Sequence, residues 1–313
     1  MKLLAFLLVP FFCFSTELDS QRDKAAPNSL EEQKTFFREN GYLWLKGFFS
    51  QEQVSMLQLL ADQINKEAQT TLQLSQASGI PLQQIAQNIP GSLIIVPEAK
   101  NPLQVCRTED MLTCYPELHR FIEGTLTFYL GLLLNEPYVL FKDKLNFKWP
   151  GGGAFPPHQD FPAYEMFGPR EHVTAMVCID PATLENGCLQ VAKNWRETFS
   201  KEPALDPEEL EAGHAVLPYV LGGKKHGSIQ SEYSDKIEWL PLVASPGDVI
   251  LISSFIPHYS EPNHSNQARR AFFFTNSRLL EGDHRRAYYH TKRQDPDNPL
   301  FHFATPTKAR NKE

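Results

Sequence analysis

The stretch PPHQDF at residues 156–161 and the stretch IPHYS at residues 256–260 carry the pattern that decides this chain. The first contains a His-x-Asp pair, His158 and Asp160, and the second adds a third candidate ligand, His258. Two histidines and one carboxylate are typical of non-haem Fe(II) sites, where they occupy one face of the metal and leave positions open for other ligands. Side chains two apart in an extended strand point the same way, so we expect His158 and Asp160 to share one strand and His258 to come from another.

A second group of polar residues follows His258. Ser260 lies two residues after it, on the same face of a strand, and Arg269 lies further along. The planar guanidinium of arginine binds a carboxylate through two parallel hydrogen bonds, so an arginine is expected wherever a dicarboxylate is anchored. Arg270 is the competing candidate. Because neighbours in a strand point to opposite faces, only one of the two arginines can enter the interior of a barrel.

Three further motifs stand in order with these residues. FRENGYL at 37–43 is followed by GFF at 47–49, ENGCL lies at 185–189, and PGD lies at 246–248. Together with the His-x-Asp pair and the His258 region, this series resembles the phytanoyl-CoA dioxygenase (PhyH-like) family of Fe(II)/2-oxoglutarate-dependent oxygenases. The resemblance covers most of the chain, from the first predicted helix to the strand that follows Arg269.

The resemblance implies an enzyme that hydroxylates a small molecule with release of succinate and CO₂. It implies that His158, Asp160 and His258 hold Fe(2+), and that 2-oxoglutarate and O₂ are the co-substrates. It further implies that Arg269 anchors the distal carboxylate of 2-oxoglutarate and that Ser260 donates a hydrogen bond to it. Because Asp160 fills the position that related halogenases leave open for a halide, we expect hydroxylation or desaturation.

Two more co-substrate contacts are implied by position in the family. Lys144 lies in FKDKLNFKWP (residues 141–150), a predicted strand whose even-numbered members share one face. The residues alone are equally consistent with an amphipathic strand that keeps its lysines in water. Gln159, between the two candidate ligands, is expected to contact the co-substrate or the substrate.

The substrate class is only coarsely indicated. Residues 142–148, with GGG at 151–153 and HQD at 158–160, are also similar to the branch of the family that includes aminophosphonate hydroxylases. We therefore expect a small amine, amino acid, phosphonate or secondary metabolite. Many members continue the NGCL turn with PGSH, whereas this chain continues with VAKNW at 191–195, so its pocket departs from the pattern. Two other classes stay open: a catalytically silent jelly-roll binding protein, and a cupin-like metal enzyme of another reaction class.

Composition and patterning predict one mainly β domain with flanking helices. The 313 residues are 42% hydrophobic, and the formal net charge of −7 offers no basic surface for nucleic acid. Short strands between Gly and Pro turns predict a double-stranded β-helix, the jelly roll of cupin-like proteins. The predicted strands are residues 138–148, 171–180, 187–192, 214–220, 237–243, 248–254 and 269–276.

Helix signals lie mainly in the N-terminal half. Ser29 followed by acidic residues predicts a helix that Gly41 ends, Ser50 predicts the start of a second helix, and residues 118–134 predict a third. The five cysteines form no C-x-x-C pair, so neither a structural zinc site nor a disulfide framework is indicated.

The N-terminal residues suggest a targeting segment. An apolar run within residues 1–15 is too short for a stable membrane span and suits the core of a signal peptide. The alternatives are an apolar N-terminal extension or a misplaced start codon, and in either case we expect a cytoplasmic protein. We expect residues 16–28 to be a linker, residues 29–290 to form the dioxygenase domain, and residues 291–313 to form a C-terminal tail.

Overall fold

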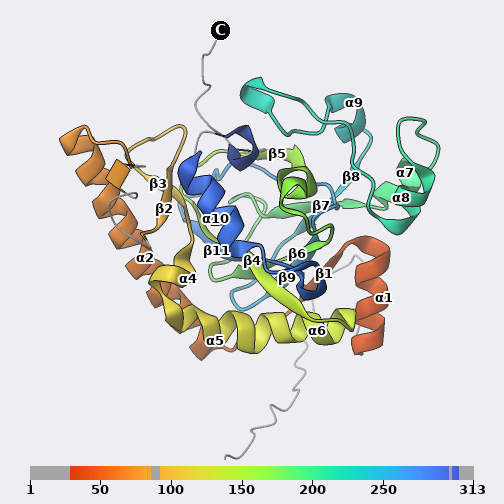
Figure 1. The fold of residues 1–313 in the computed structure, drawn as a ribbon, viewed down its shortest axis with the longest axis horizontal. Coiled ribbons are helices and arrows are strands. Elements are labelled where there is room, and N and C mark those ends of the chain that lie inside the picture. Colours follow the sequence, from red (N-terminus) through yellow and green to blue (C-terminus); the bar gives the residue numbers. More distant parts are fainter. Residues whose placement is uncertain (1–28, 83, 86–91, 296–297, 303–313) are drawn as a thin grey trace, which may run out of the picture.

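Two antiparallel sheets form the body of the protein in a computed structural model that describes residues 29–82, 84–85, 92–295 and 298–302 (Figure 1). The larger sheet has the order β1-β9-β6-β11-β4-β3-β2, and the smaller has the order β5-β10-β7-β8. The strands are β1 Tyr42–Leu45, β2 Ile94–Pro97, β3 Val105–Glu109, β4 Tyr138–Lys148, β5 Phe155–His158, β6 His172–Cys178, β7 Leu189–Lys193, β8 Glu238–Leu242, β9 Val249–Ser253, β10 His258–Ser260 and β11 Arg269–Arg278. This confirms the predicted jelly roll. The predicted signal segment and linker lie outside the described residues.

Helices from the N-terminal half cover the outer side of the larger sheet, and shorter helices lie within the loops that connect the strands (Figure 1). None of the helices within the described ranges is long and apolar enough to cross a bilayer. The helices are α1 Leu30–Asn40, α2 Gln51–Ser78, α4 Met111–Cys114, α5 His119–Phe121, α6 Phe128–Leu134, α7 Trp195–Thr198, α8 Pro207–Ala212, α9 Ser231–Ser234 and α10 Arg285–Gln294.

The predicted helix starts are confirmed at both caps. Ser29 and Ser50 each accept a hydrogen bond from the backbone N–H three residues later, and the side chains of Glu32 and Gln53 each accept one from the cap backbone N–H. Gly41 ends α1 in the left-handed conformation at φ 75°. The predicted helix over 118–134 is interrupted, because a π-helical segment at Ile122–Thr127 separates α5 from α6.

One predicted strand is wrong. Residues 214–220 form no strand, and only an isolated bridge joins Tyr219 to Ile229. Pro218 lacks the backbone N–H that a ladder needs, and the N–H of Leu217 donates to the side chain of Gln159 at 2.7 Å instead. The segment therefore serves as a loop that packs behind β5.

The larger sheet has two different faces. On its outer face, apolar residues of β4 and β11, including Leu145, Phe147 and Phe272, share a core with the helices. Its inner face shares a second apolar core with the smaller sheet, to which Met176 and Val191 belong. The inner residues of β4 are polar instead: Lys142, Lys144, Asn146 and Lys148. Burying several lysines on the inner face of a barrel costs free energy. This stretch of β4 is therefore a candidate binding site for a ligand.

Helix α10 is fastened across the barrel by charged pairs (Figure 1). Arg285 Nη2 lies 2.7 Å from Asp110 Oδ1 and 3.0 Å from Asp143 Oδ1, and Arg293 Nη2 lies 2.6 Å from Asp110 Oδ2. Asp143 is fully buried and also accepts a 2.5 Å hydrogen bond from the backbone N–H of Met111. The domain end expected at residue 290 thus falls within a docked helix that continues to residue 294.

The PGD motif at 246–248 joins β1 to β9. The buried carboxylate of Asp248 accepts hydrogen bonds from Trp44 Nε1 at 3.0 Å, Gly47 N at 2.7 Å and Ser245 N at 2.9 Å. Gly247 has φ 95°, and a Cβ there would lie 2.6 Å from a backbone carbonyl oxygen of the loop between β1 and α2. The turn requires glycine for this close approach, and the aspartate beside it satisfies three donors.

We expect Asp248→Ala to lower the free energy of unfolding by about 3 kcal/mol, because three donors lose a charged acceptor in a buried place. Urea unfolding followed by fluorescence measures the change. The exposed Asp235 offers a control, and Asp235→Ala should stay within about 0.5 kcal/mol of wild type. Equal unfolding midpoints for the two variants would contradict the role given to Asp248.

Candidate metal centre and co-substrate site

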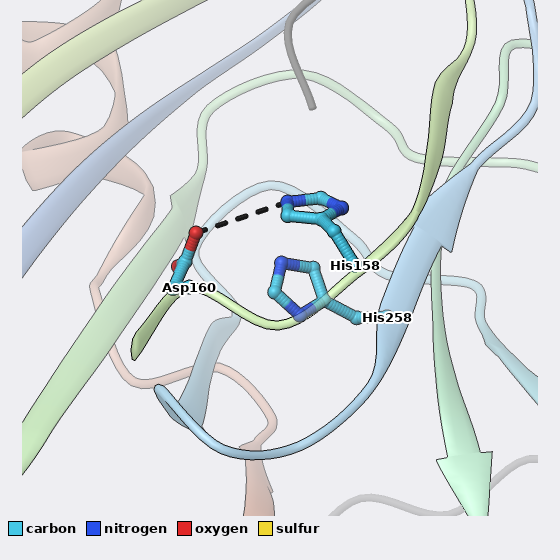
Figure 2. Close-up of side chains that lie close together, drawn as sticks. All are labelled: His158, Asp160 and His258. Carbon is cyan, nitrogen blue, oxygen red and sulfur yellow. Dashed lines mark ion pairs between the residues drawn. The ribbon is translucent and has the colours of Figure 1, made fainter. Parts of the chain in front are cut away.

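Three side chains converge between neighbouring strands of the smaller sheet (Figure 2). His158 ends β5 and His258 begins β10, and the two residues are direct partners in the antiparallel pair. Their ring centroids lie 4.2 Å apart, and His158 Nε2 lies 3.8 Å from Asp160 Oδ1. One potential ligand atom from each residue lies within 4.8 Å of the others. The prediction that His258 comes from a different strand is confirmed.

Asp160 reaches the group by a different route from the one expected. Strand β5 ends at His158, and Asp160 has the helical backbone angles φ −77° and ψ −29°. It precedes a 3₁₀ turn over Phe161–Ala163, which the hydrogen bond from Phe161 N to Ser254 O holds at 3.0 Å. The expectation that both members of the pair share a strand is therefore wrong. The turn, and not strand alternation, brings the carboxylate back toward the imidazole.

Backbone carbonyls fix both imidazoles. His158 Nδ1 lies 2.7 Å from the carbonyl oxygen of Pro156, and His258 Nδ1 lies 3.0 Å from that of Ile256. A carbonyl only accepts hydrogen bonds, so each Nδ1 carries the hydrogen and each Nε2 keeps its lone pair for a metal.

The protonation states suit metal binding. Burial and the neighbouring His258 lower the pKa of His158 to about 3. Burial acts to raise the pKa of Asp160, but the neighbouring His258 and Lys144 outweigh it and lower this pKa to about 2. His158 is thus neutral and Asp160 ionised at neutral pH, the states in which these groups bind metal. Two imidazole nitrogens and one carboxylate are a donor set that fits Fe(II).

The two arginines at the start of β11 point to opposite faces. Arg269 is buried at 3% exposure, and among the described residues no carboxylate forms an ion pair with it. Arg270 lies on the outer side, where Nε and Nη2 bind the two carboxylate oxygens of Asp180 at 2.8 and 2.9 Å. A second pair joins Arg270 to Asp62 at 2.5 Å. Arg269 is therefore the arginine that faces the interior.

Lys148 is a component of this site that the sequence analysis missed. It is the direct partner of Arg269 in the β4–β11 pair, and its Nζ donates to Ser260 Oγ at 2.8 Å. Burial and the charge of Arg269 lower the pKa of Lys148 to about 6. A Cβ at Gly187 would lie 2.9 Å from this ammonium, so the glycine of the ENGCL motif leaves it room. The signal was available, because Lys148 shares the even-numbered face of β4 with Lys144.

Lys144 faces the interior of the barrel. Its Nζ lies 4.7 Å from the ring centroid of Phe273 on β11. Burial and the charge of Lys142 lower its pKa to about 8, although Asp160 acts in the opposite direction. Lys144 thus lies near the Asp160 carboxylate, and the alternative that keeps this lysine in water does not hold.

Backbone groups satisfy the side-chain amide of Gln159. Its amide nitrogen donates to the carbonyl oxygens of Ala215 at 2.8 Å and Phe255 at 2.5 Å, and its amide oxygen accepts from Leu217 N at 2.7 Å. The side chain is 2% exposed. Both amide hydrogens and the oxygen are engaged by backbone, so Gln159 anchors the loop behind the two candidate ligands, and its expected contact with the co-substrate or the substrate stays a prediction.

Comparison with known proteins agrees with this geometry. Residues 37–271 match the phytanoyl-CoA dioxygenase (PhyH) family. A 2-aminoethylphosphonate dioxygenase from an uncultured bacterium, HF130_AEPn_1, is 34% identical over 266 residues, which cover 84% of this chain and 87% of that protein. A methylphosphonate hydroxylase from Gimesia maris is 38% identical over 189 residues, covering 60% of this chain and 64% of its own length.

Solved structures share the fold at lower identity. EctD from S. alaskensis, crystallised with 2-oxoglutarate and 5-hydroxyectoine, superposes with a TM-score of 0.56 at 19% identity, covering 84% of this chain and 80% of EctD. The non-haem α-ketoglutarate-dependent carbocyclase SnoK has a TM-score of 0.55 at 14% identity, covering 81% and 87%. The family match spans most of the sequence, and the first relative aligns over nearly all of both chains. The chain therefore belongs to the phytanoyl-CoA dioxygenase (PhyH) family.

Proposed function

We propose that this protein is an Fe(II)/2-oxoglutarate-dependent dioxygenase that hydroxylates a small phosphonate, with release of succinate and CO₂. The proposal is carried by the convergence of two imidazoles and one carboxylate in the same barrel as a buried arginine, Arg269, that pairs with no carboxylate among the described residues. Both relatives described above are named for phosphonates, which supports that substrate class.

The residues divide the work between two ends of one pocket. His158, Asp160 and His258 would hold Fe(II), whose redox chemistry with O₂ and the keto acid supplies the oxidising power. Their Nδ1 hydrogen bonds to backbone keep both rings oriented toward the metal position. At the other end, Arg269 would bind the distal carboxylate of 2-oxoglutarate, because its fork matches a carboxylate and no ion pair engages it within the part of the chain that the structure describes.

Lys148 and Ser260 would complete the co-substrate end. Lys148 holds the Ser260 hydroxyl at 2.8 Å and contributes a second cation near Arg269. Lys148 and Arg269 are two cations side by side that repel each other, and burial first, followed by this repulsion, lowers the pKa of Lys148. A dicarboxylate end between them relieves that repulsion. This argues against a silent binding protein and against a metal enzyme of another class, since neither needs a buried carboxylate clamp.

Loss of a metal ligand should abolish turnover. We expect His158→Ala or Asp160→Ala to reduce Fe(II)-dependent succinate formation by at least about 100-fold, because outer partners of metal ligands alone are worth 10- to 100-fold. Fe(II) binding measured by equilibrium dialysis should fall in parallel, with an unchanged circular dichroism spectrum. The exposed His264 provides the control, and His264→Ala should behave as wild type. Wild-type succinate formation by either ligand variant would refute the assignment.

Arg270 is a matched control for Arg269, because the two residues are neighbours on β11 and face opposite sides of the sheet. We expect Arg269→Ala to raise the KM for 2-oxoglutarate at least about 10-fold, because it truncates a buried charge partner of a carboxylate. Arg270→Ala should leave this KM within about twofold, and should instead lower stability by about 1 kcal/mol through the loss of its pair with Asp180. Steady-state kinetics and thermal unfolding separate the two effects. The reverse pattern would assign the co-substrate to Arg270.

Substrate class is tested by coupled turnover. Methylphosphonate and 2-aminoethylphosphonate should stimulate succinate formation and yield a hydroxylated phosphonate in equal amount. Small amines, amino acids and acyl thioesters lacking phosphorus should leave succinate formation at the uncoupled rate. Stimulation by one of these compounds, and by neither phosphonate, would keep the dioxygenase and reject the substrate class.

A further inference from the structure

A group of buried charges lies on the wall of the barrel formed by β3 and β4, roofed by α10. Arg107 Nε lies 2.8 Å from Glu109 Oε1, and Lys292 Nζ from α10 lies 2.6 Å from Glu109 Oε2. Glu109 and Lys144 are direct partners in the β3–β4 pair, so these charges share the face that also carries Lys142. One carboxylate therefore already serves two cations before Lys142 is considered.

Lys142 is the cation that lacks a carboxylate. Its side chain is buried at 9% exposure, and within the described ranges no hydrogen bond or ion pair engages its ammonium. Its nearest described partners are two aromatic rings, with Nζ 5.1 Å from the centroid of Tyr164 and 5.3 Å from that of Tyr288. Burial lowers the pKa of Lys142, in spite of the opposing charges of Glu109 and Asp160. The group is thus held close to the metal carboxylate without a partner of its own.

A bulge in β4 aims Lys142 at this place. The register with β11 shifts so that Asn276 faces Leu140 and Thr275 faces Lys142, which leaves Phe141 as the extra residue. The Phe141 ring also contacts Tyr164 and Tyr288, with centroids 5.4 and 5.0 Å apart. In a regular strand two consecutive residues cannot contact the same pair of rings, and a bulge permits it by re-aiming one of them.

The rings do not offset the cost of this burial. A desolvated cation–π contact contributes about 2 kcal/mol, whereas desolvation of an ammonium costs several kcal/mol even after the protein relaxes. Arg107, Lys142 and Lys292 set three basic groups against the carboxylate of Glu109, an excess of two positive charges when all three are protonated. Burial lowers the pKa of Lys292 to about 7 and also lowers that of Lys142, and a bound anion would favour their protonated forms. A phosphate-like dianion carries about that charge at neutral pH and brings three acceptor oxygens.

The position of the cluster ties it to the proposed reaction. Tyr164, whose ring faces Lys142, ends the 3₁₀ turn that follows Asp160. Tyr288, whose ring lies on the other side of Lys142, belongs to α10 together with Lys292. The excess charge thus lies one aromatic ring away from the metal motif and is closed in by the C-terminal helix.

We propose that Lys142, with Arg107 and Lys292 around Glu109, is an anion subsite that receives the phosphonate group of the substrate, and that α10 is therefore one wall of the substrate site. The choice of ligand for this subsite rests on the proposed function. The residues are different, because none of the subsite residues is among those assigned to the metal or to 2-oxoglutarate.

The test is direct binding to the anaerobic enzyme loaded with Fe(II) and 2-oxoglutarate. Isothermal titration should show that methylphosphonate binds wild type, and that Lys142→Met weakens it at least 10-fold. Lys142→Arg, which keeps the charge, should restore binding to within about threefold of wild type. The uncharged diester dimethyl methylphosphonate should not bind. Lys193→Met removes an exposed lysine from β7 and should bind methylphosphonate as wild type does.

Folding is controlled in the same samples. Methionine is nearly isosteric with lysine and removes a buried charge that no protein carboxylate neutralises, so Lys142→Met should unfold at a temperature equal to or above that of wild type. Its far-UV circular dichroism spectrum should match that of wild type. These readouts distinguish loss of the subsite from loss of structure.

Three outcomes would overturn the subsite: no methylphosphonate binding by wild type, wild-type affinity in Lys142→Met, or equally tight binding of the diester. The proposed function survives each of them if succinate formation still requires the metal ligands. Conversely, an enzyme that makes no succinate but binds methylphosphonate through Lys142 would retain the subsite and lose the dioxygenase.

Discussion

The pairing of β5 with β10 is the constraint on which the rest of the site depends. It sets His158 directly opposite His258, and two backbone carbonyls then orient both rings. Strand partners are held by the ladder at a separation that side-chain rotation cannot alter. The ladder needs support because β10 is only three residues long. That support comes from β7 on its other side, and from the loop that Gln159 fastens behind it.

Strand β4 presents apolar side chains on one face and lysines on the other. β4 sends Leu145 and Phe147 to the helices, and it sends its lysines inward. Lys148 lies beside Arg269 at one end, Lys144 lies near Asp160 in the middle, and Lys142 lies under α10 at the other end. Each of these burials lowers a lysine pKa and costs free energy in the absence of anions. The buried lysines of β4 thus favour anionic ligands inside the barrel. The apolar cores and the helices packed on the larger sheet keep these lysines in place.

The sequence predicted those features that local chemistry determines. Ser29, Ser50 and Gly41 indicate helix ends because capping depends on a few neighbouring residues. The alternation of polar and apolar residues over 138–148 predicted the full extent of β4. The metal motif was recognisable because few chemistries require that residue set. The sequence could not show that Asp160 sits in a turn, that the amide of Gln159 is used by backbone, or that residues 214–220 form a loop. Each of these depends on partners far away in the chain, as does the approach of Lys292 to Glu109.

The fastening of α10 has a consequence for the order in which the protein becomes competent. All eleven strands precede this helix in the chain, so the strands that carry His158, His258 and Arg269 can pair without residues 285–294. The roof over Lys142 arrives afterwards, as Arg285 and Arg293 dock on the acids of the barrel. In a chain whose strands have paired but whose α10 is undocked, Lys142 would face solvent while His158, His258 and Arg269 already lie on their paired strands. Docking of α10 is therefore a step that can be separated from formation of the barrel.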